Sequence, residues 1–196
     1  MMIRAVRVPV SLLAGLALAT AVQAAEPAKA LKPAEPQPAT VTPGLAVQYA
    51  YGIVNSIGEF AKRSGGKWEA GPPLPNLDYH SGAGKVLTSK ESDGVLAVIT
   101  GLIRFEKAGV YGFDVTSNDG VRVELGGAIL YEDDTVHSDD TSERIDVKVD
   151  TPGWYPLQIH YFEKRNTSTL MLRWIGPGEK GKPQVVPAKA FGHVKK

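Results

Sequence analysis

The 196-residue sequence contains no cysteine. This absence excludes disulfides, thiolate metal sites and a thiol nucleophile, and it leaves no cysteine to carry a lipoprotein anchor. A folded domain built from this chain must therefore be stabilised by its own hydrophobic core.

An excess of charge of one sign is also missing, since 22 Lys and Arg stand against 21 Asp and Glu. Nucleic acids and anionic membranes select proteins with a clustered basic surface. The charge balance therefore argues against either as the main partner.

Long apolar runs are scarce, and one stands out, from Val8 to Val22. Arg4 and Arg7 precede it, and Val22-Gln23-Ala24 supplies the small residues of a signal peptidase site. The run of about 15 residues is shorter than the roughly 20 that span a bilayer. We predict a cleaved signal peptide over 1–24 and a mature protein that is secreted or periplasmic, without membrane insertion.

The segment 25–43, "AEPAKALKPAEPQPATVTP", is rich in Pro and Ala and has no aromatic residue. Such a composition buries too little apolar area to offset the entropy of ordering. We predict an extended, semi-rigid linker there.

Alternating apolar residues dominate the remaining chain, and Gly and Pro turns separate them. These patterns predict one all-β domain over 44–192, an antiparallel sandwich or barrel, followed by a short tail over 193–196. The stretch 53–63 leaves room for one short helix. The expected strands include 45–51, 95–105, 110–117, 121–125, 144–149, 154–162 and 169–175.

Two blocks, "VLAVITGLIRFEKAGVYGFDVTSNDGVRVELGG" and "DTPGWYPLQIHYFEKRNTSTLMLRWIGPG", resemble the PA14 domain family. The opening "GLAVQYAYG" resembles the usual start of that domain, and "VVPAKAF" resembles its closing strand. The resemblance implies a β-sandwich or barrel. It also implies a function that varies among members, of which some bind glycans through a calcium ion.

The stretch "TSNDGVRVELGG" contains the most informative polar break. Asp-Gly is a common hairpin signal because it tolerates positive φ angles, so Asn118-Asp119-Gly120 reads first as a turn. The resemblance offers a second interpretation, because yeast adhesins of similar sequence hold calcium with two consecutive Asp at this position. Here Asn118 replaces the first Asp and removes one charge, so the ion should bind more weakly.

A later loop, "FEKRNTS", would complete such a site with oxygen ligands from Glu163 and Asn166. Lys164 and Arg165 lie beside them and would repel a cation. The predicted metal set is thus Asn118, Asp119, Glu163 and Asn166. The predicted carbohydrate set is Trp68, Asp119, Arg165 and Asn166.

Trp68 enters that set because it lies in a Gly- and Pro-rich excursion, where an indole can present a platform to a sugar face. Trp154 and Trp174 lie in strand patterns and are expected in the core. The acidic run 131–144 fails the calcium-loop spacing of an EF-hand and reads mainly as a solvated loop, with a weak cation site or a glycan rim as the alternative.

No catalytic motif is present, although spacing alone leaves a pair of glycosidase carboxylates open. We expect a non-enzymatic module that binds a glycan or glycoprotein, with Ca²⁺ as a cofactor. The alternative is a protein-interaction or structural envelope module that has lost the sugar site.

Overall fold

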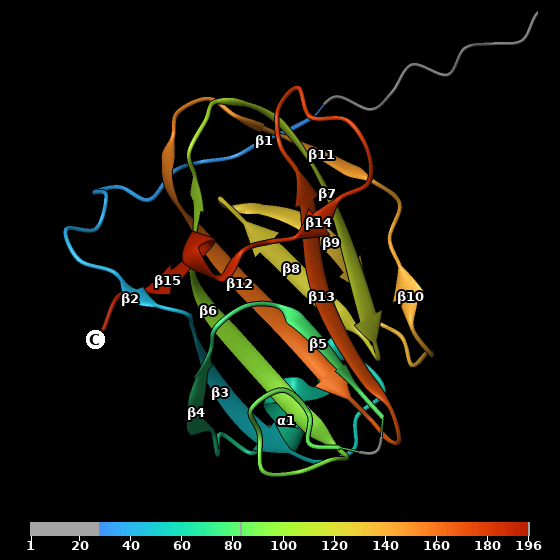
Figure 1. The fold of residues 1–196 in the computed structure, drawn as a ribbon. Coiled ribbons are helices and arrows are strands. Elements are labelled where there is room, and N and C mark those ends of the chain that lie inside the picture. Colours follow the sequence, from blue (N-terminus) through green and yellow to red (C-terminus); the bar gives the residue numbers. More distant parts are fainter. Residues whose placement is uncertain (1–27, 83, 196) are drawn as a thin grey trace, which may run out of the picture.

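A computed structural model of the chain describes residues 28–82 and 84–195. It is a β-sandwich of two sheets with one short helix, α1 (Phe60–Ser64), as Figure 1 shows. The predicted all-β fold is confirmed. The predicted signal peptide lies outside the described residues. Within the described ranges, no helix has the length and apolar character needed to cross a membrane.

The first sheet has β7 (Gly109–Asn118) at its centre, in the order β1-β11-β7-β13-β14, with β10 beside β7 and β5 beside β13. All of its strand pairs are antiparallel except β1 with β11, which is parallel. Its other strands are β1 (Lys29–Ala30), β5 (Asp78–Ser81), β10 (Asp140–Thr141), β11 (Ile145–Val149), β13 (Ser168–Ile175) and β14 (Gln184–Val185).

The second sheet follows the order β2-β15-β6-β12-β8-β9, with β3 also paired to β6 and β4 paired to β3. The long antiparallel pair β6 and β12 forms its middle. Its strands are β2 (Thr42–Pro43), β3 (Leu45–Tyr51), β4 (Glu69–Leu74), β6 (Val95–Phe105), β8 (Val121–Leu125), β9 (Ala128–Asp133), β12 (Gly153–Glu163) and β15 (Phe191–His193).

The core lies between the sheets and consists of the inward residues that the alternation predicts. Val121, Val123 and Leu125 of β8 are all buried, as are Tyr111, Phe113 and Val115 of β7. A second, smaller cluster, which includes Phe60, Leu96 and Phe162, involves α1 and β12. Because strand side chains alternate between faces, β12 contributes Tyr161 to the main core and Phe162 to this outer cluster.

The short helix expected within 53–63 forms only over Phe60–Ser64, and a 3-10 turn (Ile57–Glu59) leads into it. The block "VVPAKAF" does not form one closing strand either. Its first residue ends β14, a 3-10 turn (Ala188–Ala190) follows, and its last residue begins β15. Pro187 lies between the two strands, and its missing N–H cannot donate to a sheet ladder.

Residues 28–43 differ from the linker that the composition predicts. They are extended, but they lie against the sandwich rather than apart from it (Figure 1). The Leu31 side chain is only 6% exposed, and the backbone of Lys32 donates to the Gly126 carbonyl at 2.9 Å. One apolar anchor and backbone pairing at β1 and β2 therefore order a segment whose composition is typical of disorder.

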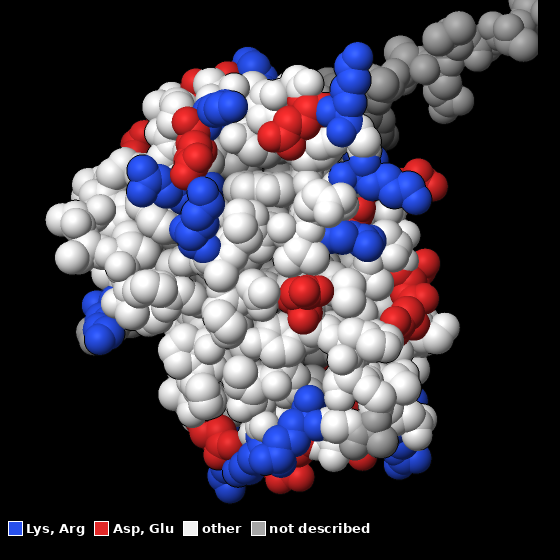
Figure 2. Space-filling view, viewed as in Figure 1, with Lys and Arg blue, Asp and Glu red and all other residues white. Residues whose placement is uncertain are grey.

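Acidic and basic side chains are interspersed on the face in Figure 2, without a large patch of one sign. This distribution agrees with the balanced composition and gives that face no basic track for a polyanion.

Candidate functional site at the Asn118–Asp119 corner

Residues 118–120 do not form the hairpin turn that Asp-Gly suggests. β7 ends at Asn118 in the first sheet and β8 begins at Val121 in the second, so the three residues cross between sheets. The Asn118–Asp119 peptide bond is cis, and neither Asp119 nor Gly120 has a positive φ. Gly120 is needed for space instead, because a Cβ there would meet the Phe162 ring and the Asp133 carbonyl.

Asp119 is held rigidly at this corner and is only 3% exposed. Its Oδ1 accepts the backbone N–H of His137 at 3.0 Å, and its Oδ2 accepts that of Lys164 at 2.7 Å. Burial raises the pKa of Asp119, and the two backbone N–H groups oppose that rise only in part. The carboxylate is therefore held in one orientation and is largely shielded from solvent.

Two hydrogen bonds from its amide nitrogen orient the side chain of Asn118. Its Nδ2 donates to Asp139 Oδ1 and to Thr167 Oγ1, each at 2.9 Å. Burial raises the pKa of Asp139, but hydrogen bonds from Asn118 and Thr169 and the nearby His80 outweigh it and leave that pKa lowered. An ionised carboxylate only accepts hydrogen bonds, so the amide nitrogen must face it and the carbonyl Oδ1 of Asn118 faces away.

The loop after β12 brings Asn166 and Arg165 to the same corner. Asn166 has φ 77°, a left-handed conformation that Asn tolerates well, and its N–H donates to Asp93 Oδ1 at 2.8 Å. The Lys164 ammonium donates to Asn55 Oδ1 at 2.9 Å, so it is engaged by an uncharged partner. Arg165 is exposed.

These residues surround a hollow of about 470 Å³, which we call the corner hollow. The structure thus brings together Asn118, Asp119, Arg165 and Asn166, four of the six residues that the sequence singles out. The hollow is lined by Asn118, Asp119, Val136, His137, Ser138, Lys164, Arg165, Asn166 and Thr167.

Glu163 does not line the corner hollow, although it directly precedes the loop that does. Its side chain is fully buried, and neither carboxylate oxygen has a hydrogen-bond partner of normal geometry among the described residues. Burial, followed by the charges of Asp93 and Asp119, raises the pKa of Glu163 to about 8, against a smaller opposing effect of the Gly94 and Val95 N–H groups. Glu163 is therefore a buried acid beside the corner, and it is largely protonated at neutral pH.

Trp68 lies elsewhere. Its ring packs at 6.1 Å, centroid to centroid, from Phe60 in the outer cluster, and it lines a separate hollow with Tyr51, Arg63 and Glu69. Only part of the indole is exposed, because α1 covers one side of it.

The corner has the chemistry for a hard cation but few charges. Calcium takes six to eight oxygen ligands, and the corner offers the Asp119 carboxylate and the amide oxygens of Asn118 and Asn166. In 28–82 and 84–195, no three His, Cys, Asp or Glu side chains converge closely enough to hold a metal ion. A calcium ion at this corner would need backbone oxygens, water or the hydroxyls of a bound ligand to complete its shell.

Three contributors at this corner are absent from the predicted site residues: Asp139, His137 and Asp93. Asp139 and His137 belong to the acidic run 131–144, which is mostly exposed, as expected of a solvated loop, but contacts Asn118 and Asp119 through these two residues. The run's length and charge are visible in the sequence, but its partners are set by tertiary contacts 18 and 21 residues away.

Comparison with known proteins places this geometry in context. The sequence model of the PA14 domain matches residues 79–186. No curated protein matches the chain.

Solved structures share the fold at low sequence identity. The PA14 domain of the MpAFP antifreeze protein has a TM-score of 0.64 at 15% identity, covering 80% of this chain and 93% of that one. The PA14 sugar-binding domain from an RTX adhesin has a TM-score of 0.60 at 16% identity, covering 78% and 99%. The epithelial adhesin 6 A domain from Candida glabrata, solved with Galβ1-3GlcNAc, has a TM-score of 0.67 at 12% identity, covering 85% and 93%.

Proposed function

This chain belongs to the PA14 domain family, and from that premise we propose that it is a non-catalytic carbohydrate-binding domain whose corner hollow receives a sugar. The observation that carries the proposal is the fixed pair of oxygen ligands at Asn118 and Asp119. Both are held by hydrogen bonds before any ligand arrives, so little ordering entropy remains to be lost on binding.

We propose that Ca²⁺ binds at Asp119 with the amide oxygens of Asn118 and Asn166, and that Arg165 contacts the glycan from the exposed side of the hollow. The ion would supply a positive centre for vicinal sugar hydroxyls. The chain's own residues orient the ligand oxygens and withhold water from Asp119, which is 3% exposed. Asn118 carries no charge, so this site is expected to be weaker than one with two carboxylates.

The setting we propose is outside the cytoplasm, with the predicted signal peptide removed and an envelope or extracellular glycan as the partner. The adhesin domains of similar fold support this setting, because the RTX adhesin domain is described as sugar-binding and the Candida domain was solved with a disaccharide.

The test uses a variant that removes a ligand without disturbing the corner. Asn166→Gly deletes the side-chain oxygen, while glycine accepts φ 77° freely and keeps the N–H that bonds Asp93. Asp119→Ala is less informative, because it strips two backbone N–H groups of their acceptor.

The measurement is the thermal midpoint with calcium and then with chelator, followed by a glycan array in both conditions. We expect calcium to raise the midpoint of the unmodified protein and of the exposed-surface control Lys180→Ala, but not that of Asn166→Gly. Array binding lost on chelation and in Asn166→Gly supports a calcium-dependent lectin. A calcium-independent midpoint with a blank array would contradict the proposal and favour a protein-interaction module.

A further inference from the structure

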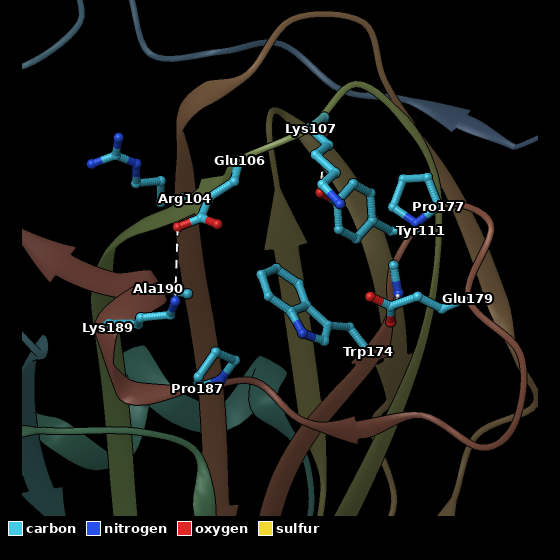
Figure 3. A pocket seen from close by; sticks show the side chains of 11 residues that line it. Arg104, Glu106, Lys107, Tyr111, Trp174, Pro177, Glu179, Pro187, Lys189 and Ala190 are labelled. Atoms are coloured by element: carbon cyan, nitrogen blue, oxygen red, sulfur yellow. Dashed lines mark hydrogen bonds and ion pairs between the residues drawn. The ribbon is translucent and has the colours of Figure 1, made fainter.

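A second hollow lies at the other end of the sandwich and is lined by the ring of Trp174 (Figure 3). On β13, Thr169 pairs with Asn118 at the corner, and Trp174 pairs with Phe113 five residues later. At about 3.3 Å per strand residue, the two ends lie roughly 16 Å apart along the strand. The two hollows share no lining residue.

The indole of Trp174 is fixed by its neighbours. Its ring centroid lies 5.4 Å from that of Tyr111, 5.6 Å from Phe105 and 6.0 Å from Phe113. Trp174 is nevertheless only partly buried, so the side facing the hollow is not covered by the core. The sequence pattern places this residue in the core. In the structure, Trp174 packs against the core and also lines the hollow.

Acidic and basic side chains surround the Trp174 ring, as Figure 3 shows. On one side the Glu106 carboxylate and the Lys189 ammonium form an exposed pair at 3.9 Å. On the other side the Glu179 carboxylate accepts the Gly176 N–H at 3.0 Å, and Lys107 reaches over the hollow near Tyr111. Acceptors and donors thus flank one apolar surface.

This arrangement matches the chemistry of a sugar ring. The C–H face of a pyranose is apolar and packs on an aromatic ring, while its hydroxyls both donate and accept hydrogen bonds at the edge. The hollow measures about 210 Å³. Sites for drug-sized ligands range from roughly 300 to 1,000 Å³, so a single ring suits this one.

The charges favour a neutral ring. The lining contains two ammonium groups and two carboxylates, and the guanidinium of Arg104, the remaining cation of the lining, lies over the Trp154 ring at 5.7 Å. Figure 3 shows Arg104 directed away from the hollow. The one excess positive charge of the lining is therefore that of Arg104, which points away from the hollow and is poorly placed to select an acidic sugar.

We propose that the Trp174 hollow is a second carbohydrate site, which takes one neutral sugar ring stacked on the indole without a metal ion. This inference goes beyond the proposed function, because it concerns different residues and a different requirement for calcium. A domain with a sugar site at each end can bridge two glycan chains.

The experiment follows the three tryptophan indole N–H signals of the purified, ¹⁵N-labelled protein by NMR in the presence of chelator. The probes are methyl β-D-glucopyranoside and methyl β-D-galactopyranoside, with methyl β-D-glucuronide as the charged comparison. We expect a saturable shift of the Trp174 signal with at least one neutral glycoside at millimolar concentration, and no shift of the Trp154 signal.

Two exposed variants test the assignment without touching the core. Lys107→Ala and Glu179→Ala should each weaken binding at least about threefold, whereas Asn166→Gly should leave it unchanged. Lys180→Ala is the matched surface control. The independence from Asn166 separates this proposal from the first, since either can fail alone.

Three results would overturn the proposal. One is the absence of a saturable Trp174 shift up to about 100 mM of both neutral probes, a concentration at which even a very weak specific site would be occupied. Another is a shift that neither Lys107→Ala nor Glu179→Ala changes. The third is a Trp174 shift caused by a proline-rich peptide and by neither glycoside, because prolines also dock on aromatic floors.

Discussion

The amide of Asn118 donates to the carboxylate of Asp139 at 2.9 Å, and this bond decides which atom of Asn118 faces the corner hollow. Asp139 belongs to an acidic run that resembles a solvated loop in the sequence. At the proposed calcium site it would be a positioning residue, because it holds Asn118 and does not itself line the corner hollow. Its carboxylate also accepts a hydrogen bond from Thr169 at 2.9 Å.

Replacing Asp139 by Ala should therefore weaken calcium binding, although Asp139 is itself an exposed residue that does not line the corner hollow. Outer-sphere partners of metal ligands typically change metal affinity by about 10- to 100-fold, and we expect a loss near the lower limit. Isothermal titration of calcium measures the loss, and urea unfolding should show a cost of about 1–3 kcal/mol. Glu143→Ala removes an exposed carboxylate from the same run and should change neither quantity. Equal affinities in the two variants would contradict the positioning role.

Glu163 predicts a pH dependence of stability. Its pKa is about 8 in the fold, against an ordinary value of 4.5 for a solvated glutamate, so the folded protein holds a proton between these values that the unfolded chain releases. The free energy of unfolding then falls as the pH rises through that window, by about 1.4 kcal/mol per pH unit at most. The raised pKa of Asp119 acts in the same direction above its ordinary value of 3.8, whereas the lowered pKa of Asp139 affects stability only below pH 3.8, outside this window.

Glu163→Gln keeps the neutral form and should flatten this slope. Urea unfolding at several pH values between about 5 and 8 measures it in chelator. We expect Glu163→Gln to be more stable than the unmodified protein near pH 8 and nearly equal to it in stability near pH 5. A steep slope that persists in Glu163→Gln would show that another group holds the proton.

The fold could be predicted from the sequence because its strands follow a period of two with little ambiguity. Val95–Phe105 and Leu45–Tyr51 are strands with the predicted bounds. The corner was harder. Asn118-Asp119-Gly120 carries a hairpin signal, and only the pairing of β7 and β8 with different sheets shows that no hairpin forms there.

Glu163, Trp68 and Asp139 show why the candidate site was predicted only in part. Residue type marks Glu163 as an oxygen donor, but its burial depends on which face of β12 it occupies and on what packs there. Trp68 reads as a free platform until α1 is placed beside it. Asp139 contacts the site through its hydrogen bond with Asn118, which lies 21 residues earlier in the sequence. No local sequence pattern predicts a contact between residues so far apart in the chain.

The segment 28–43 should contribute to stability through Leu31, whose side chain is 6% exposed. Leu31→Ala is expected to lower the free energy of unfolding by about 2 kcal/mol, near the lower end for buried leucines because the site is at the rim of the core. Urea unfolding measures the loss, and the exposed neighbour Lys32→Ala should change it by less than about 0.5 kcal/mol. If both variants unfold like the unmodified protein, the segment 28–43 does not stabilise the domain.

Gly120 links the packing of the sandwich to the geometry of the corner. Its φ is not positive, so alanine is acceptable to the backbone, but the new Cβ would meet the Phe162 ring and lie 2.9 Å from the Asp133 carbonyl. Phe162 is fully buried and cannot move freely, so we expect Gly120→Ala to cost about 1–3 kcal/mol. Gly82→Ala is the matched control, because a Cβ there meets nothing within 4 Å.

Displacement of Gly120 also moves Asp119, so calcium affinity should fall together with stability. Urea unfolding and calcium titration of both variants test this link. A Gly120→Ala protein with unchanged stability would mean that the close approach to Phe162 relaxes without cost. A destabilised variant that still binds calcium normally would mean that the corner keeps its geometry independently of the packing beneath it.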